Sequence, residues 1–155
     1  MDAQFVIFKI GDDTYGADIY NIYEIIFPKE PTKMPNNPDF IEGVIEYRGI
    51  MVPVLDLKKR FNLGESTFTG QSRLVVAEVG EDLVAFSVDE VTEILKVQPE
   101  EIKAAPDMTK IDKKYIKGIV KQDGRLIVVL DLAKVLTVDE MDILRSMEVD
   151  KEKTR

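Results

Sequence analysis

The alternation of apolar and polar residues predicts a chain built mainly from short β-strands. A mostly apolar strand over residues 5–10 ends at the turn sequence Gly11-Asp12-Asp13 and resumes at residue 14, which indicates a hairpin. Residues 74–79 and 83–88 repeat this arrangement around Gly80-Glu81-Asp82. Further β-branched and apolar runs cover residues 52–57 and 126–132. Short strands therefore dominate the expected structure.

Two segments of the chain align with each other without a gap at an offset of 75 residues. The segment FIEGVIEYRGIMVPVLDLKKRF, residues 40–61, matches YIKGIVKQDGRLIVVLDLAKVL, residues 115–136, and eight of the 22 pairs are identical. Residues 5–27 match residues 74–96 more weakly at an offset of 69. The sequence is therefore an internal duplication, which indicates two similar structural units.

The size of the repeat indicates the architecture. A unit of roughly 65 to 70 residues made of short strands is too small for a large sandwich, whereas a small closed barrel removes exposed sheet edges. We expect a mostly β fold with two small barrels side by side, as subdomains at about residues 14–72 and 73–137. The strand before residue 14 could be shared between them. A capping-box pattern from Thr137 to Glu140 predicts a helix and tail over residues 138–155.

Composition removes most enzyme classes from consideration. The 155 residues include no Cys and no His, which excludes disulfides, a thiolate nucleophile, a Cys/His metal site and a Ser-His-Asp triad. The net charge of −8 repels nucleic-acid phosphates and anionic lipids. No phosphate-binding glycine loop is present. We therefore expect a protein-binding module with no metal and no cofactor, and a carboxylate-based enzyme is the weakest alternative.

The start of the chain indicates a location. The segment MDAQFVIFKI has no basic region or cleavage site typical of a secretion signal. No apolar run approaches the roughly 18 residues that cross a bilayer. Together with the absence of Cys, this predicts a cytoplasmic location.

The two repeats differ at the turn between their best-matched strands. Tyr47-Arg48-Gly49-Ile50 stands where the other repeat has Gln122-Asp123-Gly124-Arg125. Both glycines are expected at tight turns that need a positive φ. Because the second turn is made without an arginine at this position, Arg48 is a candidate for recognition. Glu24 recurs as Glu93, and the sequence favours a structural and a functional role for it equally.

Three segments resemble the CheW family of chemotaxis coupling proteins: YGADIYNIYEI, NNPDFIEGVIEYRGIMVPVLDLKKRF and GRLIVVLDLAKVL. The most specific element is G-V-I-x-x-R-G-x-x-x-P-V-x-D-L over residues 43–57. The resemblance covers nearly the whole chain. It implies a single CheW-like domain over residues 1–155, with two five-stranded SH3-like barrels packed across a hydrophobic core.

The resemblance also implies a function. CheW proteins are non-catalytic adaptors that couple the histidine kinase CheA to the cytoplasmic tips of chemoreceptors, the methyl-accepting chemotaxis proteins. The chain is then expected in the cytoplasm, recruited to receptor clusters at the inner face of the membrane, where rings or arrays with receptor and kinase could form. The main alternative is a CheW-like scaffold of another receptor-kinase pathway, such as pilus-based motility.

Four residues match positions that the family uses to bind the kinase regulatory domain. The resemblance implies an apolar patch from Val6 on the first strand and Ile19 and Ile22 after the hairpin. One helical turn would bring Ile19 and Ile22 to the same face. Gly43 resembles a position important to kinase association, although its role in the backbone is an alternative explanation.

Four further residues match the receptor side. Family members bind the receptor tip along the groove between barrels, and Glu24 with Arg48 resembles the exposed charged pair associated with coupling. Arg48 can present its guanidinium to a receptor carboxylate or to Glu24 itself. Gly49 completes this turn, and Ala85 is assigned to the groove although the family often has glycine there.

Overall fold

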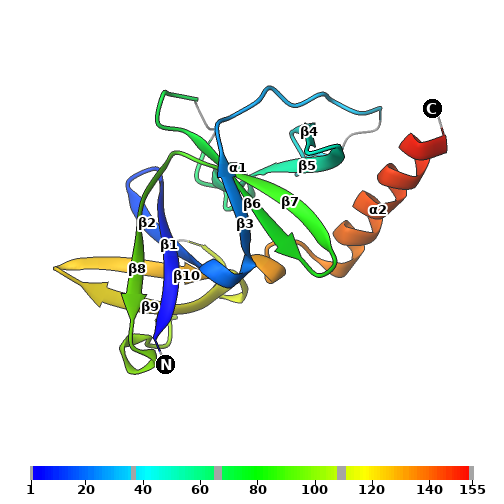
Figure 1. Ribbon diagram of the computed structural model, residues 1–155. Helices are drawn as coiled ribbons and strands as arrows, with labels where there is room; N and C mark the ends of the chain where they lie inside the picture. Colours follow the sequence, from blue (N-terminus) through cyan, green and yellow to red (C-terminus); the bar gives the residue numbers. More distant parts are fainter. Residues whose placement is uncertain (1, 36–37, 65–67, 108–110, 154–155) are drawn as a thin grey trace.

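Two five-stranded β-sheets form the protein in a computed structural model that describes residues 2–35, 38–64, 68–107 and 111–153 (Figure 1). The first sheet has the strand order β3-β6-β7-β5-β4 and the second the order β8-β1-β2-β10-β9. Each curls into a small barrel, named the first and second barrel accordingly. The expected mostly β fold with two five-stranded barrels is confirmed.

The strands of the first barrel are β3 (Ile22–Ile26), β4 (Gly43–Tyr47), β5 (Ile50–Asp56), β6 (Arg73–Val79) and β7 (Asp82–Val88). Those of the second are β1 (Ala3–Ile10), β2 (Asp13–Asp18), β8 (Glu90–Val97), β9 (Ile116–Gln122) and β10 (Arg125–Leu130). The helices are α1 (Leu57–Arg60), α2 (Val138–Lys153) and the 3-10 turns η1 (Ile19–Asn21), η2 (Pro99–Glu101), η3 (Lys113–Tyr115) and η4 (Leu132–Lys134).

The division of strands between the barrels differs from the expected boundary near residue 72. The first barrel is one continuous segment, residues 22–88, and the second combines residues 3–18 with residues 90–130. Each barrel takes a hairpin from one repeat, β1–β2 or β6–β7, and three strands from the other. The exchange is possible because β2 pairs in parallel with β10 and β7 with β5, and parallel pairing joins strands that are distant in sequence.

Three hydrophobic cores fill this arrangement. One lies inside the first barrel and includes Val54, Leu74 and Ala85. Another lies inside the second barrel and includes Ile7 and Val129. The largest lies between the barrels, where side chains from both sheets, α1 and α2 pack together; it includes Phe8, Tyr15, Leu55, Phe61, Phe86, Tyr115 and Leu144. Burial of this shared core holds the two barrels in a fixed relation.

Equivalent turns join the matched strands of the two barrels. Arg48 and Gly49 have φ values of 50° and 81°, and Asp123 and Gly124 have values of 53° and 78°. Positive φ at both central residues is the two-residue hairpin geometry that matches the twist of the strands. The expected positive φ at both glycines is confirmed.

In each barrel the two edge strands of the sheet face each other, and we call the line where they meet the seam. Short backbone bridges close each seam. The seam between β3 and β4 is bridged by Thr32 and Val44, and the seam between β8 and β9 by Lys103 and Ile119. A Cβ atom added to Gly43 would lie 2.6 Å from the carbonyl oxygen of Thr32. The backbone of the bridging segment therefore requires a glycine at this point.

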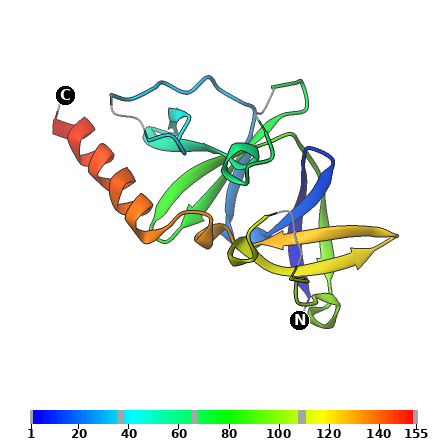
Figure 2. The same ribbon diagram turned by 180° about the vertical axis from the view of Figure 1, so that it is seen from behind.

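The expected C-terminal helix is present as α2 and projects beside the β6–β7 hairpin (Figure 2). The backbone N–H of Glu140 donates to the Thr137 hydroxyl at 3.1 Å, and that of Thr137 donates to the Glu140 carboxylate at 2.9 Å. Arg60 on α1 binds the same carboxylate through two hydrogen bonds of 2.5 and 2.8 Å. A capping box and an ion pair thus fix the start of α2. Residues 154 and 155 of the expected tail lie outside the described residues.

Candidate functional site

A charged pair lies at the seam of the first barrel, between β3 and the β4–β5 turn. The guanidinium of Arg48 donates through Nη2 to Oε1 of Glu24 at 2.9 Å. The hydroxyl of Tyr47 donates to the same carboxylate oxygen. The side chain of Arg48 is 67% exposed and that of Glu24 36% exposed. The fold therefore brings Glu24, Arg48 and the adjacent Gly49 together on the surface.

The surroundings of this pair keep both of its groups charged at neutral pH. The hydrogen bond from Tyr47 is the main cause that lowers the pKa of Glu24; partial burial opposes it, and the charge of Arg48 lowers the pKa further. The negative charge of Glu24 raises the pKa of Arg48. Burial and the bond to Glu24 raise the pKa of Tyr47, so the phenol stays protonated and remains a donor.

Aromatic and apolar side chains border the pair. The ring of Tyr23 meets that of Tyr47 edge to face, with centroids 6.2 Å apart, and the Arg48 guanidinium lies 5.5 Å from the Tyr47 ring centroid. Exposed apolar residues continue along η1, β3, the residue after β3 and the start of β5: Tyr20, Tyr23, Ile25, Phe27 and Ile50. Apolar area of this extent next to an ordered charged pair is typical of a protein-binding surface.

The residues assigned to kinase binding lie at different depths. Ile19 and Ile22 are half-buried at the crossing from the second barrel to the first, and Ile22 packs against the central core. Val6 lies on β1 in the second barrel, opposite Ala17 and Ile94, and is only 2% exposed. Gly43 is buried. Ile19 and Ile22 can therefore contact a partner directly, whereas Val6 and Gly43 cannot.

Ala85, which the sequence assigned to the receptor side together with Glu24 and Arg48, lies apart from this charged pair. It lies on β7, opposite Val54 and Val76, and its side chain is completely buried inside the first barrel. Gly49, in contrast, is exposed, and nothing lies within 4 Å of the position that a Cβ atom would take. The receptor-side candidates thus form one surface group of three residues and one interior residue.

The second barrel carries an acid-arginine pair at the equivalent seam. Nη2 of Arg125 donates to Oε2 of Glu93 at 3.1 Å. The arginine comes from the first position after the turn, where the first barrel has Ile50, and Gln122 occupies the position of Tyr47. Comparing the repeats position by position could not reveal this pair, because the two arginines are not aligned.

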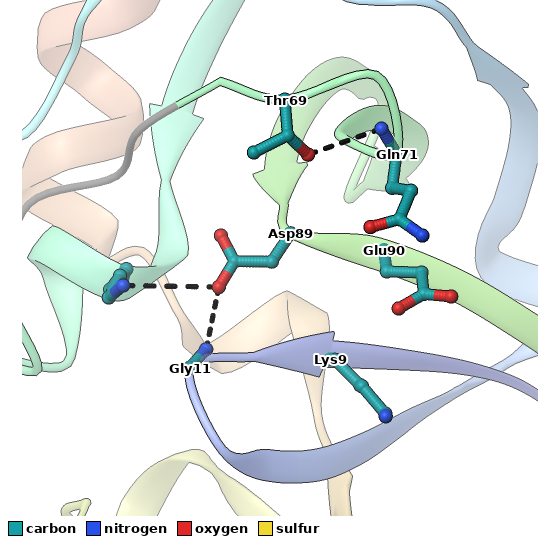
Figure 3. Close-up of a pocket in the computed structure, with 7 residues that line it drawn as sticks. Lys9, Gly11, Thr69, Gln71, Asp89 and Glu90 are labelled. Atoms are coloured by element: carbon teal, nitrogen blue, oxygen red, sulfur yellow. Dashed lines mark hydrogen bonds and ion pairs between the residues drawn. The ribbon is translucent and has the colours of Figure 1, made fainter.

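A polar cavity of about 220 Å³ lies at the junction of the two barrels (Figure 3). Asp89, between β7 and β8, accepts a hydrogen bond from the backbone N–H of Gly11 at 2.6 Å. Its carboxylate also lies 3.9 Å from the ammonium of Lys58 on α1. The backbone N–H of Asp89 donates to the carbonyl of Lys9 at 2.9 Å. These contacts join the barrels, so the cavity is a structural junction in which charges of both signs meet.

Comparison with known proteins gives the family. A family model described as "CheW-like domain" matches residues 4–140. The chain belongs to the CheW family. It is 31% identical to the chemotaxis protein CheW of Klebsiella aerogenes, over 91% of this chain and 86% of that protein, and 33% identical to CheW of Thermotoga maritima, over 87% and 88%. The crystal structure of the scaffolding protein TtCheW from Thermoanaerobacter tengcongensis is similar, with 34% identity, a TM-score of 0.83 and coverage of 90% and 91%.

Membership of the CheW family confirms the resemblance found in the sequence. CheW proteins are non-catalytic scaffold or adaptor proteins of chemotaxis, which confirms that the chain is not an enzyme. Within the described parts of the chain, no cluster of acidic, His or Cys side chains could hold a metal ion. No helix among those same residues is long and apolar enough to span a bilayer.

Proposed function

We propose that this protein couples chemoreceptors to the histidine kinase CheA as an adaptor. The exposed and ordered pair of Glu24 and Arg48 carries the proposal. The second barrel makes the same turn with Asp123, so the fold does not require an arginine at this position. A charged side chain that folding does not require, held in a defined position on the surface, is suited to recognition.

We assign the charged pair and Gly49 to the receptor. The guanidinium of Arg48 can donate to a carboxylate on the helical tip of a chemoreceptor while it keeps its bond to Glu24. The open space around Gly49 supports a close approach of the receptor backbone. Ala85, inside the barrel, would influence this surface only through the packing of β7 against β5 and β6.

We assign the apolar surface around η1 and β3 to the kinase regulatory domain. Ile19 and Ile22 would contact the kinase directly, together with the exposed neighbours Tyr20 and Tyr23. Val6 and Gly43 are buried, so they would contribute indirectly, by keeping the strands that carry them in place. Because Ile22 and Glu24 share strand β3, one rigid element would hold receptor and kinase in a fixed relation.

This role implies a location and an assembly. The protein would act in the cytoplasm, recruited to receptor clusters at the inner face of the membrane. Pseudo-symmetric contacts of the two barrels would allow rings or arrays with receptor and kinase. Mixtures of the three purified components that form only one-to-one complexes at high concentration would contradict the formation of rings or arrays.

Co-sedimentation of CheA with receptor-containing membranes tests the coupling. The protein should increase both the bound kinase and its autophosphorylation rate. Arg48→Glu should abolish recruitment to the membranes but leave binding to CheA in solution unchanged, whereas the matched variant Arg125→Glu in the second barrel should behave as wild type. Ile22→Asp should lose CheA binding, and Val138→Asp, at an exposed apolar position of α2, serves as its control.

The choice of receptor and kinase matters in this assay. A scaffold of another receptor-kinase pathway, such as pilus-based motility, would use the same surfaces. The receptor and kinase encoded in neighbouring genes are therefore the pair to test. If the protein changes neither binding nor kinase activity with that pair, the proposed coupling is wrong.

A further inference from the structure

Tyr47 links the interior of the first barrel to the charged pair on its surface. The side chain is 4% exposed and belongs to the core inside the barrel, together with Val52 and Val54. Its hydroxyl nevertheless reaches the seam and donates to Glu24. A buried aromatic ring has few accessible rotamers, so the position of this hydroxyl is fixed by core packing.

The charged pair alone would not hold a fixed geometry. An ion pair between two long exposed side chains gains little energy in water and opposes the rotamer entropy of both chains. Tyr47 removes part of this freedom, because its hydroxyl and Nη2 of Arg48 donate to the same oxygen, Oε1 of Glu24. The Tyr47 ring also lies beside the Arg48 guanidinium, 5.5 Å away.

This arrangement leaves part of each charged group available. Among the described residues, neither Oε2 of Glu24 nor Nε and Nη1 of Arg48 has a hydrogen-bond partner. The pair therefore presents an acceptor and a set of donors side by side. A partner surface with a carboxylate next to an N–H donor is complementary to it.

We propose that Tyr47 is a positioning residue, which fixes Glu24 and, through it, the orientation in which Arg48 meets a carboxylate of the receptor tip. The proposal rests on the proposed receptor binding and deepens it. The second barrel supports a special role for Tyr47 in the first. There Gln122 occupies the equivalent position and makes no hydrogen bond to Glu93. Both barrels have an acid-arginine pair, and only the first has a core-anchored donor beneath it.

Binding of a purified receptor-tip fragment to Tyr47→Phe tests the proposal. The phenylalanine keeps the ring in the barrel and removes only the hydroxyl. We expect binding about three- to tenfold weaker, because the receptor must then order two side chains that the hydroxyl holds in wild type. The unfolding midpoint should fall only modestly, as expected from the loss of one hydrogen bond with the ring kept in place. Tyr115→Phe, which removes a hydroxyl next to the central core, should bind as wild type. Wild-type affinity of Tyr47→Phe would overturn the proposal.

A double-mutant cycle separates positioning from a general structural effect. If Tyr47 acts through Glu24, then Tyr47→Phe should change the affinity less than about twofold in a Glu24→Ala background, which removes the accepting oxygen. An equal loss of affinity in both backgrounds would mean that the tyrosine acts through the barrel as a whole, and would overturn the proposal.

An NMR measurement on the free protein makes the test independent of any partner. The heteronuclear NOE of the Arg48 Nε–H group should indicate an ordered side chain in wild type and a mobile one in Tyr47→Phe. If the receptor fragment fails to bind wild type, the proposed function is wrong, and this measurement alone decides about positioning. Equal order of Arg48 in both proteins would overturn the positioning role.

Discussion

The two barrels share a framework but differ in the side chains at one corresponding seam. In both, a glutamate on the edge strand binds an arginine from the neighbouring hairpin. In the first barrel the arginine occupies the turn itself and a tyrosine supports the glutamate from below. In the second the arginine follows the turn and a glutamine replaces the tyrosine.

The residues that are identical in both repeats have structural roles. Asp56 accepts hydrogen bonds from backbone N–H groups at the start of α1, and Asp131 does the same at the start of η4. Gly49 and Gly124 supply the positive φ of equivalent turns. Identity between repeats therefore reports what the fold needs, and a difference between them indicates where one barrel has gained a separate task.

The largest expected effect on stability is at the seam glycines. Gly43→Ala should lower the free energy of unfolding by about 3 kcal/mol, because φ is +150° and the new Cβ would lie 2.6 Å from a backbone oxygen. Gly118→Ala should cost less, about 2 kcal/mol, because φ is not positive there, although the new Cβ would lie 2.5 Å from Cγ2 of Ile102 and 3.0 Å from the carbonyl oxygen of Lys103. Urea denaturation measures both.

A third glycine serves as the control for this pair. Gly70 has open space around it, so Gly70→Ala should stay within about 0.5 kcal/mol of wild type. Equal losses at Gly43 and Gly118 would mean that the two seams are under the same constraint.

The next effect concerns helix α2, whose start is fixed by Arg60 of α1. Arg60→Val introduces the residue found at the equivalent position of the second barrel, Val135, and removes both hydrogen bonds to Glu140. We expect a loss of about 2 kcal/mol and faster amide hydrogen exchange along α2. Lys59→Ala, which removes only a longer and more exposed pair with Glu42, should leave the exchange unchanged.

The same contact should make stability depend on pH. Burial raises the pKa of Glu140, but the hydrogen bonds from Arg60 and Thr137 outweigh it and leave the pKa below its ordinary value of 4.5. A lowered pKa in the folded state contributes stability above about pH 4.5 that is lost as the pH falls through the lowered pKa. Between about pH 7 and 3, wild type should therefore lose more stability than Arg60→Val. Parallel curves for the two proteins would contradict this.

The smallest effect on stability, and a strong one on coupling, is expected from transferring the second turn to the first barrel. Arg48→Asp combined with Ile50→Arg gives the first barrel the charge arrangement of the second. The unfolding midpoint should stay the same, because both positions are exposed and both turns have the same geometry. Kinase recruitment to receptor membranes should be lost. Retained recruitment would show that the position of the arginine is irrelevant.

Much of the fold follows from the sequence because it depends on local pattern. Turn glycines, strand alternation and the gap-free repeat were sufficient to predict two small β-barrels, and the resemblance to the CheW family supplied the number of five strands in each. The exchange of hairpins was not predictable, because β1 and β2 are covered by β8 and β10, strands more than seventy residues further along. Alternation indicates which face of a strand is buried but not which strand lies beside it.

The site was predictable only in part for the same reason. Arg48 stood out as a difference between repeats, and its resemblance to a family position joined it to Glu24. Tyr47 did not stand out, because its place in the alternation is that of an interior residue. Whether its hydroxyl reaches Glu24 depends on how β3 and β4 meet across the seam. The buried positions of Val6 and Ala85 likewise depend on pairing between distant strands.

The hairpin exchange has a consequence for synthesis on the ribosome. The β1–β2 hairpin is made first, but its parallel partner β10 follows roughly 110 residues later, a delay of about 5–20 s at ordinary elongation rates. The continuous first barrel can form during this interval. The apolar β1–β2 hairpin stays without its neighbours until the last strands of the second barrel are made. This hairpin is therefore the segment of the nascent chain most in need of a chaperone.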